Sequence, residues 1–274
     1  AAAALLVDGK IIAASEEERF TRKKFDAQFP VNSAKFCLEH GGLKIENIDY
    51  VVFYEKHFSK FERILSNALA FFPKTVGTFI AAIPLWLNEK LWFEHVFYKH
   101  MPRPSKAARK AGKVPQFLYS DHHLSHAASS YFCSGFEESA LLTVDGVGEW
   151  STTTMGRARG NKIEILKRLE YPHSLGLLYA TFTAFLGFEV NADEYKVMGL
   201  AAYGKPTFVD DILKIVDIKE DGSFHLDMRY FGYPYSRLSY NKKFIELFGE
   251  PREPESTCEE RHANLAASIQ KVTE

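Results

Sequence analysis

The densest group of metal-type ligands lies in residues 120–126, which read Ser-Asp-His-His-Leu-Ser-His. His122 and His126 are four residues apart, so on a helix their imidazoles share one face about one turn apart. That spacing lets two ring nitrogens reach one metal ion. His123 stands where the HExxH motif of zinc proteases needs a glutamate, so this motif is different. Ordinary hydrogen bonds at a helix N-terminus are the alternative, but three histidines directly after a predicted strand favour a metal site.

A second group follows the apolar strand expected at residues 139–144. Asp145 could hold a cation, and Gly146 and Gly148 would let backbone amides approach a phosphate closely. The alternative is a plain Asp-Gly hairpin turn, which is common. Ser174 is a good helix N-cap, and a helix N-terminus attracts anions, although a cap without any ligand is the simpler interpretation.

Cations form a third group. Arg19, Arg22 and Lys24 belong to the run Arg-Phe-Thr-Arg-Lys-Lys, which could bind a phosphate or another anionic ligand. A solvated basic loop is the alternative. Nucleic acid is disfavoured, because 34 Lys and Arg residues against 35 Asp and Glu residues leave a net charge of −1. Lys196 could contact a nucleotide or only solvent.

The elements that must position these residues follow from periodicity and turn signals. An Asp8-Gly9 hairpin is expected first, with a capping box from Ser15 to Glu18, and residues 102–114 are expected to form a loop. Strands are expected at residues 4–7, 10–14, 50–54, 116–119, 139–144, 150–157 and 162–169. Helices are expected at residues 32–40, 122–133, 174–186 and 193–202, and within 58–100, 209–216 and 257–272. Three strands followed by a helix is the order of a ribonuclease H-like unit, and a second such unit starts near residue 138.

The whole chain has the composition of a globular protein of about two domains, with 274 residues, 46% of them hydrophobic. Its three widely spaced cysteines form no disulfide framework, which favours a reducing, cytoplasmic setting. No signal peptide is expected. Residues 64–87 are apolar, but Pro73, Lys74 and Pro84 interrupt them, so we expect a buried helical pair or a face for a partner rather than a membrane span.

Four blocks in order resemble one family: residues 16–24 (EEERFTRKK), 121–129 (DHHLSHAAS), 144–149 (VDGVGE) and 194–204 (EYKVMGLAAYG). They are similar to those of the NodU/CmcH-type O-carbamoyltransferases, and the resemblance spans nearly the whole chain. It implies an α/β, actin-like ATPase (ASKHA) fold built from two ribonuclease H-like halves. Residues 1–137 would form the first half, without its first strand, and residues 138–274 the incomplete second half. The hairpin at residues 4–14 would then superpose on residues 150–169.

The resemblance also implies a reaction. A YrdC-like domain, expected beyond residue 274, would make carbamoyl-adenylate from carbamoyl phosphate and ATP. The actin-like domain would transfer the carbamoyl group to a hydroxyl of a small-molecule acceptor. The family's early histidine, which handles the acceptor, has no counterpart here, so no catalytic base is assigned and residues 1–274 alone are expected to be inactive.

The expected site residues fall into three sets, and the resemblance implies the five that are named first. The metal ligands would be His122, His126 and Asp145, for Fe2+ first, with Zn2+ or Mg2+ as alternatives. Lys24 and Gly146 would contact the carbamoyl-adenylate. The rest of the nucleotide site would be Gly148, Ser174 and Lys196, and Arg19 and Arg22 would contact substrate.

Two other function classes stay open. One is a metal-dependent sugar kinase or related actin-like ATPase, against which the blocks at residues 16–24 and 121–129 argue, because phosphoryl transfer does not require them. The other is a non-catalytic binding module. Neither a nucleic acid nor a membrane is expected as a partner, and a homodimer remains open.

Overall fold

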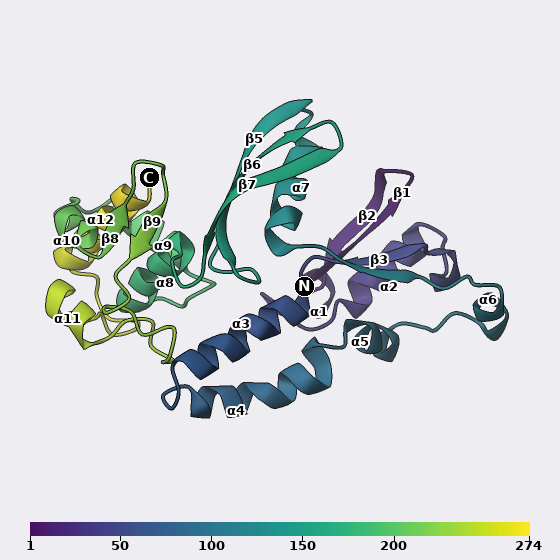
Figure 1. Ribbon diagram of the computed structural model, residues 1–274, viewed down its shortest axis with the longest axis horizontal. Helices are drawn as coiled ribbons and strands as arrows, with labels where there is room; N and C mark the ends of the chain where they lie inside the picture. The colour runs from purple at the N-terminus through teal and green to yellow at the C-terminus, as the bar shows by residue number, and fades with distance from the viewer. The chain divides into compact units, whose positions relative to one another are not determined.

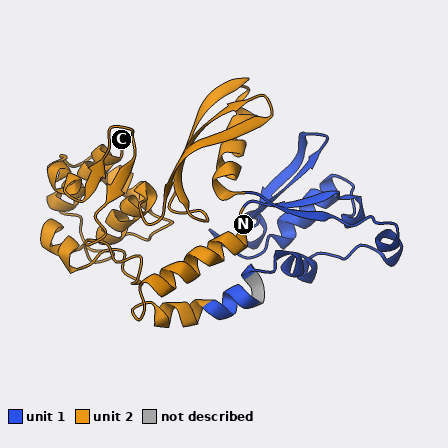
Figure 2. Cartoon of the chain, in the orientation of Figure 1, with its two compact units in different colours: residues 1–54, 83–120 blue, residues 55–82, 121–274 orange. Residues whose placement is uncertain are grey.

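Helices and strands mix along the chain, and the computed structural model describes residues 1–87 and 90–274. Within these residues the strands form four small sheets. This confirms the predicted α/β class. Two compact units divide the chain, one of residues 1–54 and 83–120 and the other of residues 55–82 and 121–274 (Figure 2). The predicted division near residue 137 into ribonuclease H-like halves stays a prediction.

The first unit begins with the predicted hairpin, formed by β1 (Ala2–Val7) and β2 (Lys10–Glu16) (Figure 1). Asp8 and Gly9 have φ values of 49° and 77°, the left-handed conformation that a two-residue hairpin turn requires. Strand β3 (Tyr50–Phe53) pairs in parallel with β4 (Gln116–Tyr119). The helices are α1 (Glu18–Thr21), α2 (Val31–His40), η1 (Ile45–Asn47), α5 (Phe93–His100) and α6 (Lys106–Lys110).

Glu17 ties the hairpin to α2. Its buried carboxylate accepts the backbone N–H groups of Asn32 and Ser33, at 3.1 and 2.9 Å, and their side chains, at 2.7 and 3.0 Å. The predicted capping box from Ser15 to Glu18 is wrong, because Glu17 already has helical geometry and caps nothing in α1. The Glu18 carboxylate accepts the N–H of residue 25 instead.

The second unit contains an antiparallel sheet in the order β5-β6-β7, formed by β5 (Glu138–Val144), β6 (Ser151–Arg159) and β7 (Lys162–Glu170). Helix α7 (His122–Ser134) contacts all three strands (Figure 1). A small sheet pairs β8 (Val216–Ile218) with β9 (Phe224–Leu226). The other helices are α3 (His57–Ala70), α8 (Leu175–Phe185), α9 (Glu194–Ala201), α10 (Val209–Leu213), α11 (Lys242–Phe248) and α12 (Glu260–Thr273).

A core of buried aromatic and aliphatic side chains fixes α8 in this unit. The rings of Phe182 and Phe185 each lie 5.1 Å from the ring of Phe244 in α11, measured between centroids. Leu265 and Ile269 of α12 are fully buried in the same cluster. Each such side chain stabilises the fold by about 1.5–3 kcal/mol. The core therefore holds α8, whose N-terminus meets the turn at Asp145.

Several short elements differ from the sequence prediction. Helix α6 lies in residues 102–114, where we predict a loop; Ser105 caps it by accepting the N–H of Ala108 at 3.1 Å. Strands β8 and β9 and helix α11 are not predicted. Three-residue strands are too short to show alternation, and α11 is only two turns long.

The apolar residues 64–87 form no membrane span: among the described residues, none of the helices is both long and apolar enough to cross a bilayer. They divide between α3 and α4 (Val76–Leu85), which begins in the second unit and ends in the first. Helix α4 buries none of its residues, and Ile80 is 64% exposed. The alternative of a buried helical pair is therefore wrong for α4.

Candidate metal centre

Three metal-type ligands converge in the second unit. His122 Nε2 lies 2.7 Å from Asp145 Oδ2 and 3.1 Å from His126 Nε2, and Asp145 Oδ2 lies 3.7 Å from His126 Nε2. Ligand atoms bound at about 2.0–2.2 Å to one ion are themselves about 3.0–3.6 Å apart in octahedral to tetrahedral geometry. The predicted convergence is confirmed, and two imidazoles with one carboxylate are donors that suit a divalent transition metal.

Helix α7 begins at His122, so that His122 and His126 both lie in its first turns. Asp121 is its N-cap, and its side chain accepts the N–H of Leu124 at 3.3 Å. The rings of His122 and His126 lie on the same side of the helix, with centroids 4.8 Å apart. Gly135 ends the helix with a φ of 76°, a left-handed conformation that favours glycine.

His123 anchors α7 to the sheet instead of joining the ligands. Its ring is fully buried; Nε2 donates to the carbonyl of Ser151 at 2.8 Å, so Nδ1 accepts from the hydroxyl of Thr143 at 2.7 Å. Burial lowers the pKa of His123 and favours this neutral form. The three adjacent histidines therefore divide into two candidate ligands and one structural residue.

The Asp145 carboxylate is held by its own turn as well as by histidine. The N–H of Gly146 donates to Oδ1 at 2.7 Å, which leaves Oδ2 facing the imidazoles. The hydrogen bond from His122 holds the pKa of Asp145 well below its usual range, and the same bond raises the pKa of His122. A cation bound to Asp145 Oδ2 and His122 Nε2 would displace the proton that these two atoms share.

Two glycines allow the Asp145 turn to pack closely. A Cβ atom on Gly148 would come within 3.0 Å of His122 Cβ, and one on Gly176 within 2.6 Å of the Asp145 carbonyl oxygen. Gly148 therefore leaves room for a candidate ligand, and Gly176 lets the N-terminus of α8 approach the turn. The contact of Gly148 with a phosphate stays a prediction.

Ser174 connects α8 to the same turn. It is fully buried, caps α8 by accepting the N–H of Leu177 at 3.0 Å, and its hydroxyl lies 2.6 Å from the carbonyl oxygen of Gly146 and 3.1 Å from that of Asp145. This confirms the predicted cap. Contacts of Ser174 and Gly146 with a nucleotide stay predictions.

Sequence reasoning does not single out two buried acids behind His122. Glu149 Oε1 accepts the backbone N–H of Lys56 at 2.7 Å and that of His122 at 3.1 Å, so one carboxylate joins the starts of α3 and α7. Glu55 Oε2 lies 3.8 Å from His122 Nδ1 and 2.7 Å from Lys60 Nζ. The sequence feature that could have identified them is their position, because each acid lies shortly after the end of a predicted strand.

The predicted cationic residues are all exposed or partly exposed. Arg19, Arg22 and Lys24 lie in the first unit; Arg19 forms a 3.3 Å ion pair within its own turn, and Lys24 Nζ lies 5.0 Å from the ring of Phe25. Lys196 forms a 2.9 Å ion pair with the aspartate three residues before it, which raises the pKa of Lys196. Their contacts with nucleotide or substrate stay predictions.

Known proteins resemble the chain over its whole length. Residues 1–274 match the family model described as carbamoyltransferase N-terminus. An uncharacterized protein of Synechocystis sp. is 49% identical over 275 residues, which cover 100% of this chain and 44% of that protein. Nodulation protein NolNO of Sinorhizobium fredii is 31% identical over 277 residues, which cover 100% of this chain and 36% of that protein.

A third relative, an uncharacterized protein of Methanocaldococcus jannaschii, is 31% identical over 235 residues, which cover 85% of this chain and 37% of that protein. The chain thus spans less than half the length of each of these relatives. The match of the family model from the first residue to the last decides the assignment. The chain belongs to the carbamoyltransferase N-terminus family.

Proposed function

We propose that this chain is part of an O-carbamoyltransferase. The enzyme transfers a carbamoyl group from carbamoyl phosphate, through a carbamoyl-adenylate made with ATP, to a hydroxyl of a small-molecule acceptor. The family match over residues 1–274 is the observation that carries this proposal. We assign the ATP-dependent activation to a YrdC-like domain outside these residues, and the transfer to an actin-like fold in which β5, β6, β7 and α8 begin the second half.

His122, His126 and Asp145 are the proposed ligands of a divalent metal. Two histidines with one carboxylate and open positions are a donor set that suits non-haem Fe2+, and Zn2+ and Mg2+ are the alternatives. When bound, the ion would hold phosphate oxygens and neutralise charge that develops on the leaving group. The 2.7–3.7 Å spacing of the ligand atoms supports this assignment.

Other residues of the chain hold these ligands or supply charge. Glu149 fixes the start of α7, and Ser174 fixes the turn that carries Asp145. Lys24, as a cation, would pair with the phosphate of the adenylate, with Arg19 and Arg22 on the substrate side. The acceptor hydroxyl must lose its proton to a base, and none of these residues is assigned that role.

Pyrophosphate release tests the proposal most simply. Purified full-length protein should release pyrophosphate from ATP only when carbamoyl phosphate is present. Water removes the phosphate of carbamoyl phosphate as inorganic phosphate, and the carbamate that remains attacks the α-phosphorus of ATP and expels pyrophosphate. A sugar kinase would instead release ADP when its sugar is present, and carbamoyl phosphate would not change that release. Absence of any ATP turnover, together with absence of bound metal, would indicate a non-catalytic binding module.

A further inference from the structure

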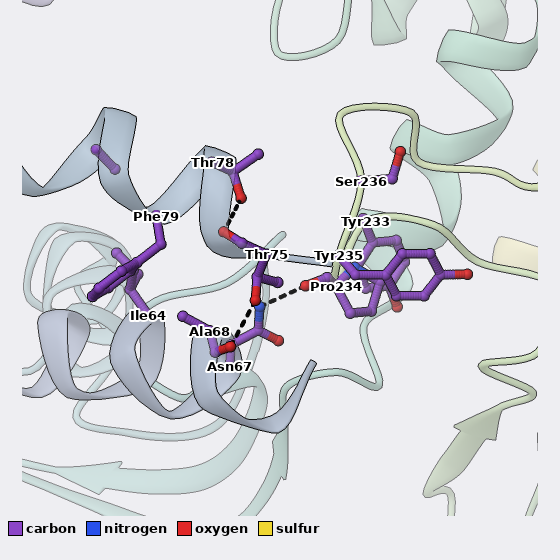
Figure 3. Close-up of a pocket in the computed structure, with 11 residues that line it drawn as sticks. Ile64, Asn67, Ala68, Thr75, Thr78, Phe79, Tyr233, Pro234, Tyr235 and Ser236 are labelled. Atoms are coloured by element: carbon purple, nitrogen blue, oxygen red, sulfur yellow. Dashed lines mark hydrogen bonds between the residues drawn. The ribbon is translucent and has the colours of Figure 1, made fainter. Parts of the chain in front are cut away.

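A cavity of about 230 Å³ opens in the second unit between α3, the first turns of α4 and the loop of residues 233–236 (Figure 3). Its walls carry hydroxyl groups, one amide and aromatic rings. Among the described residues that line it, none has a charged side chain. A charged ligand would therefore lose its hydration there without gaining a counter-charge.

The hydroxyl groups of the cavity are already oriented. Thr75 donates its proton to the carbonyl of Ala68 at 2.6 Å, and Thr78 donates to the carbonyl of Thr75 at 2.9 Å (Figure 3). Both hydroxyl oxygens can therefore only accept from a ligand. The Ser236 hydroxyl oxygen accepts the backbone N–H of Leu238 at 3.1 Å, which leaves its own proton to be donated. A hydroxyl group of a ligand can donate to Thr75 or Thr78 and can accept from Ser236, so hydroxyl groups match this wall.

Apolar and aromatic side chains form the rest of the wall. Phe79 and Ile64 face the cavity from the two helices, and Tyr235 faces it from the loop (Figure 3). Lys74 Nζ lies 4.8 Å from the centroid of the Tyr235 ring and so helps to hold that ring in place. These surfaces suit the C–H groups of a saturated ring.

The walls are fixed before any ligand binds. Asn67 Nδ2 donates to the carbonyl of Pro234 at 2.6 Å, which joins α3 to the loop (Figure 3). Asn67 Oδ1 accepts from the hydroxyl of Tyr171 at 3.0 Å. The hydroxyl of Tyr233 donates to the carbonyl of Pro172 at 2.6 Å. Preformed walls reduce the ordering cost of binding.

We infer that this cavity binds an uncharged ring compound with several hydroxyl groups, about the size of one sugar or cyclitol. Its volume lies below the roughly 300–1,000 Å³ of pockets for drug-sized ligands, so one ring is the expected size. Helix α3 spans about 16 Å from Lys56, beside Glu149, to Asn67. The cavity is therefore separate from the metal centre, and the inference goes beyond the proposed function.

Saturation-transfer NMR on the purified protein tests binding, with methyl β-D-glucopyranoside and myo-inositol as probes and EDTA present. Either probe should bind, and Ala68→Leu, which fills the cavity, should weaken binding at least tenfold. Thr78→Leu places a larger side chain at an exposed position of the cavity wall, and this variant replaces Ala68→Leu in the test if Ala68→Leu perturbs folding. Ala81→Leu, on an exposed position of the same helix outside the lining, should bind like the wild type.

Three results would overturn the inference: no saturation transfer to either probe, binding that both filling variants retain, or equal binding of glucose 6-phosphate. None of them bears on pyrophosphate release, so the two proposals fail separately. A ligand that binds is then incubated with the full-length protein, ATP and carbamoyl phosphate. Recovery of the ligand unchanged, with an altered rate of pyrophosphate release, supports a site separate from the metal centre, whereas a gain of the mass of a carbamoyl group would contradict that separation.

Discussion

Glu149 shows how one buried carboxylate positions a candidate ligand. It accepts the N–H of His122, at the first residue of α7, and the N–H of Lys56. We expect Glu149→Gln to weaken metal binding by about 10–100-fold, the usual cost of losing a group that orients a ligand. Calorimetric metal titration checks this, with Glu138→Gln on the exposed start of β5 as control. An unchanged affinity would show that Glu149 only stabilises the fold.

Glu17 gives a pH-dependent prediction. Burial raises its pKa, but the four hydrogen bonds from Ser33 and Asn32 outweigh burial, so the pKa lies below the ordinary 4.5. Its contribution to stability is therefore present above about pH 4.5 and lost as pH falls through the lower folded value.

The test compares Glu17→Gln with the wild type by urea unfolding across this pH range. The variant should be less stable by about 1–3 kcal/mol at neutral pH, and the difference should shrink in acid. Glu39→Gln, which is exposed in α2, is the control. A difference that stays constant down to the lowest pH would contradict the assigned hydrogen bonds.

The sequence indicates the three candidate ligands but not the residues that hold them. His122 and His126 are readable because helical spacing places them on one face, and Asp145 because it ends an apolar strand. Glu149 is not readable, since the backbone N–H groups that it accepts lie 27 and 93 residues away in sequence. Such contacts depend on how elements pack, which local patterns do not encode.

At the scale of elements, α8 depends on one glycine. A Cβ atom on Gly176 would lie 2.6 Å from the Asp145 carbonyl oxygen and the Gly146 nitrogen, so either α8 or the turn must shift. We expect Gly176→Ala to destabilise the protein by about 1–3 kcal/mol, the usual cost of overpacking. Thermal unfolding measures it.

Gly199→Ala is the matched control. Gly199 lies within α9, and an added Cβ atom meets nothing within 4 Å. This substitution should be neutral or stabilising by about 0.5–1 kcal/mol, because alanine loses less backbone entropy in a helix. If both variants unfolded at the same temperature, the close approach of α8 to the Asp145 turn would be contradicted.

Elements with strong local signals are the ones that the sequence predicts. The Asp8-Gly9 turn defines the first hairpin, and the helix expected at residues 122–133 is α7, whose cap at Asp121 the structure adds. The capping box at Ser15 fails because Glu17, with its tertiary contacts to α2, sets the local geometry there. Tertiary contacts override local preference at that position.

For the whole molecule, composition and block order predict the class and the family, and the structure adds what they do not contain. The apolar residues 64–87 are recognisable as a helical region, but only the structure shows that α3 and α4 line a cavity with the loop of residues 233–236. The helix residues and the loop residues that line this cavity lie more than 150 residues apart in sequence. Asn67 and Pro234, which share a hydrogen bond, are 167 residues apart.

We propose that His122, His126 and Asp145 bind one metal ion, and anaerobic titration of the metal-free protein with Fe2+, repeated with Zn2+, measures that binding. We predict one ion per chain and an affinity at least 100-fold weaker in His126→Ala and in Asp145→Asn, because each removes a ligand. His95→Ala, on an exposed face of α5, should bind like the wild type. A wild-type protein that binds no stoichiometric metal, or ligand variants that bind metal as tightly as the wild type, would show that these three residues do not form a metal site.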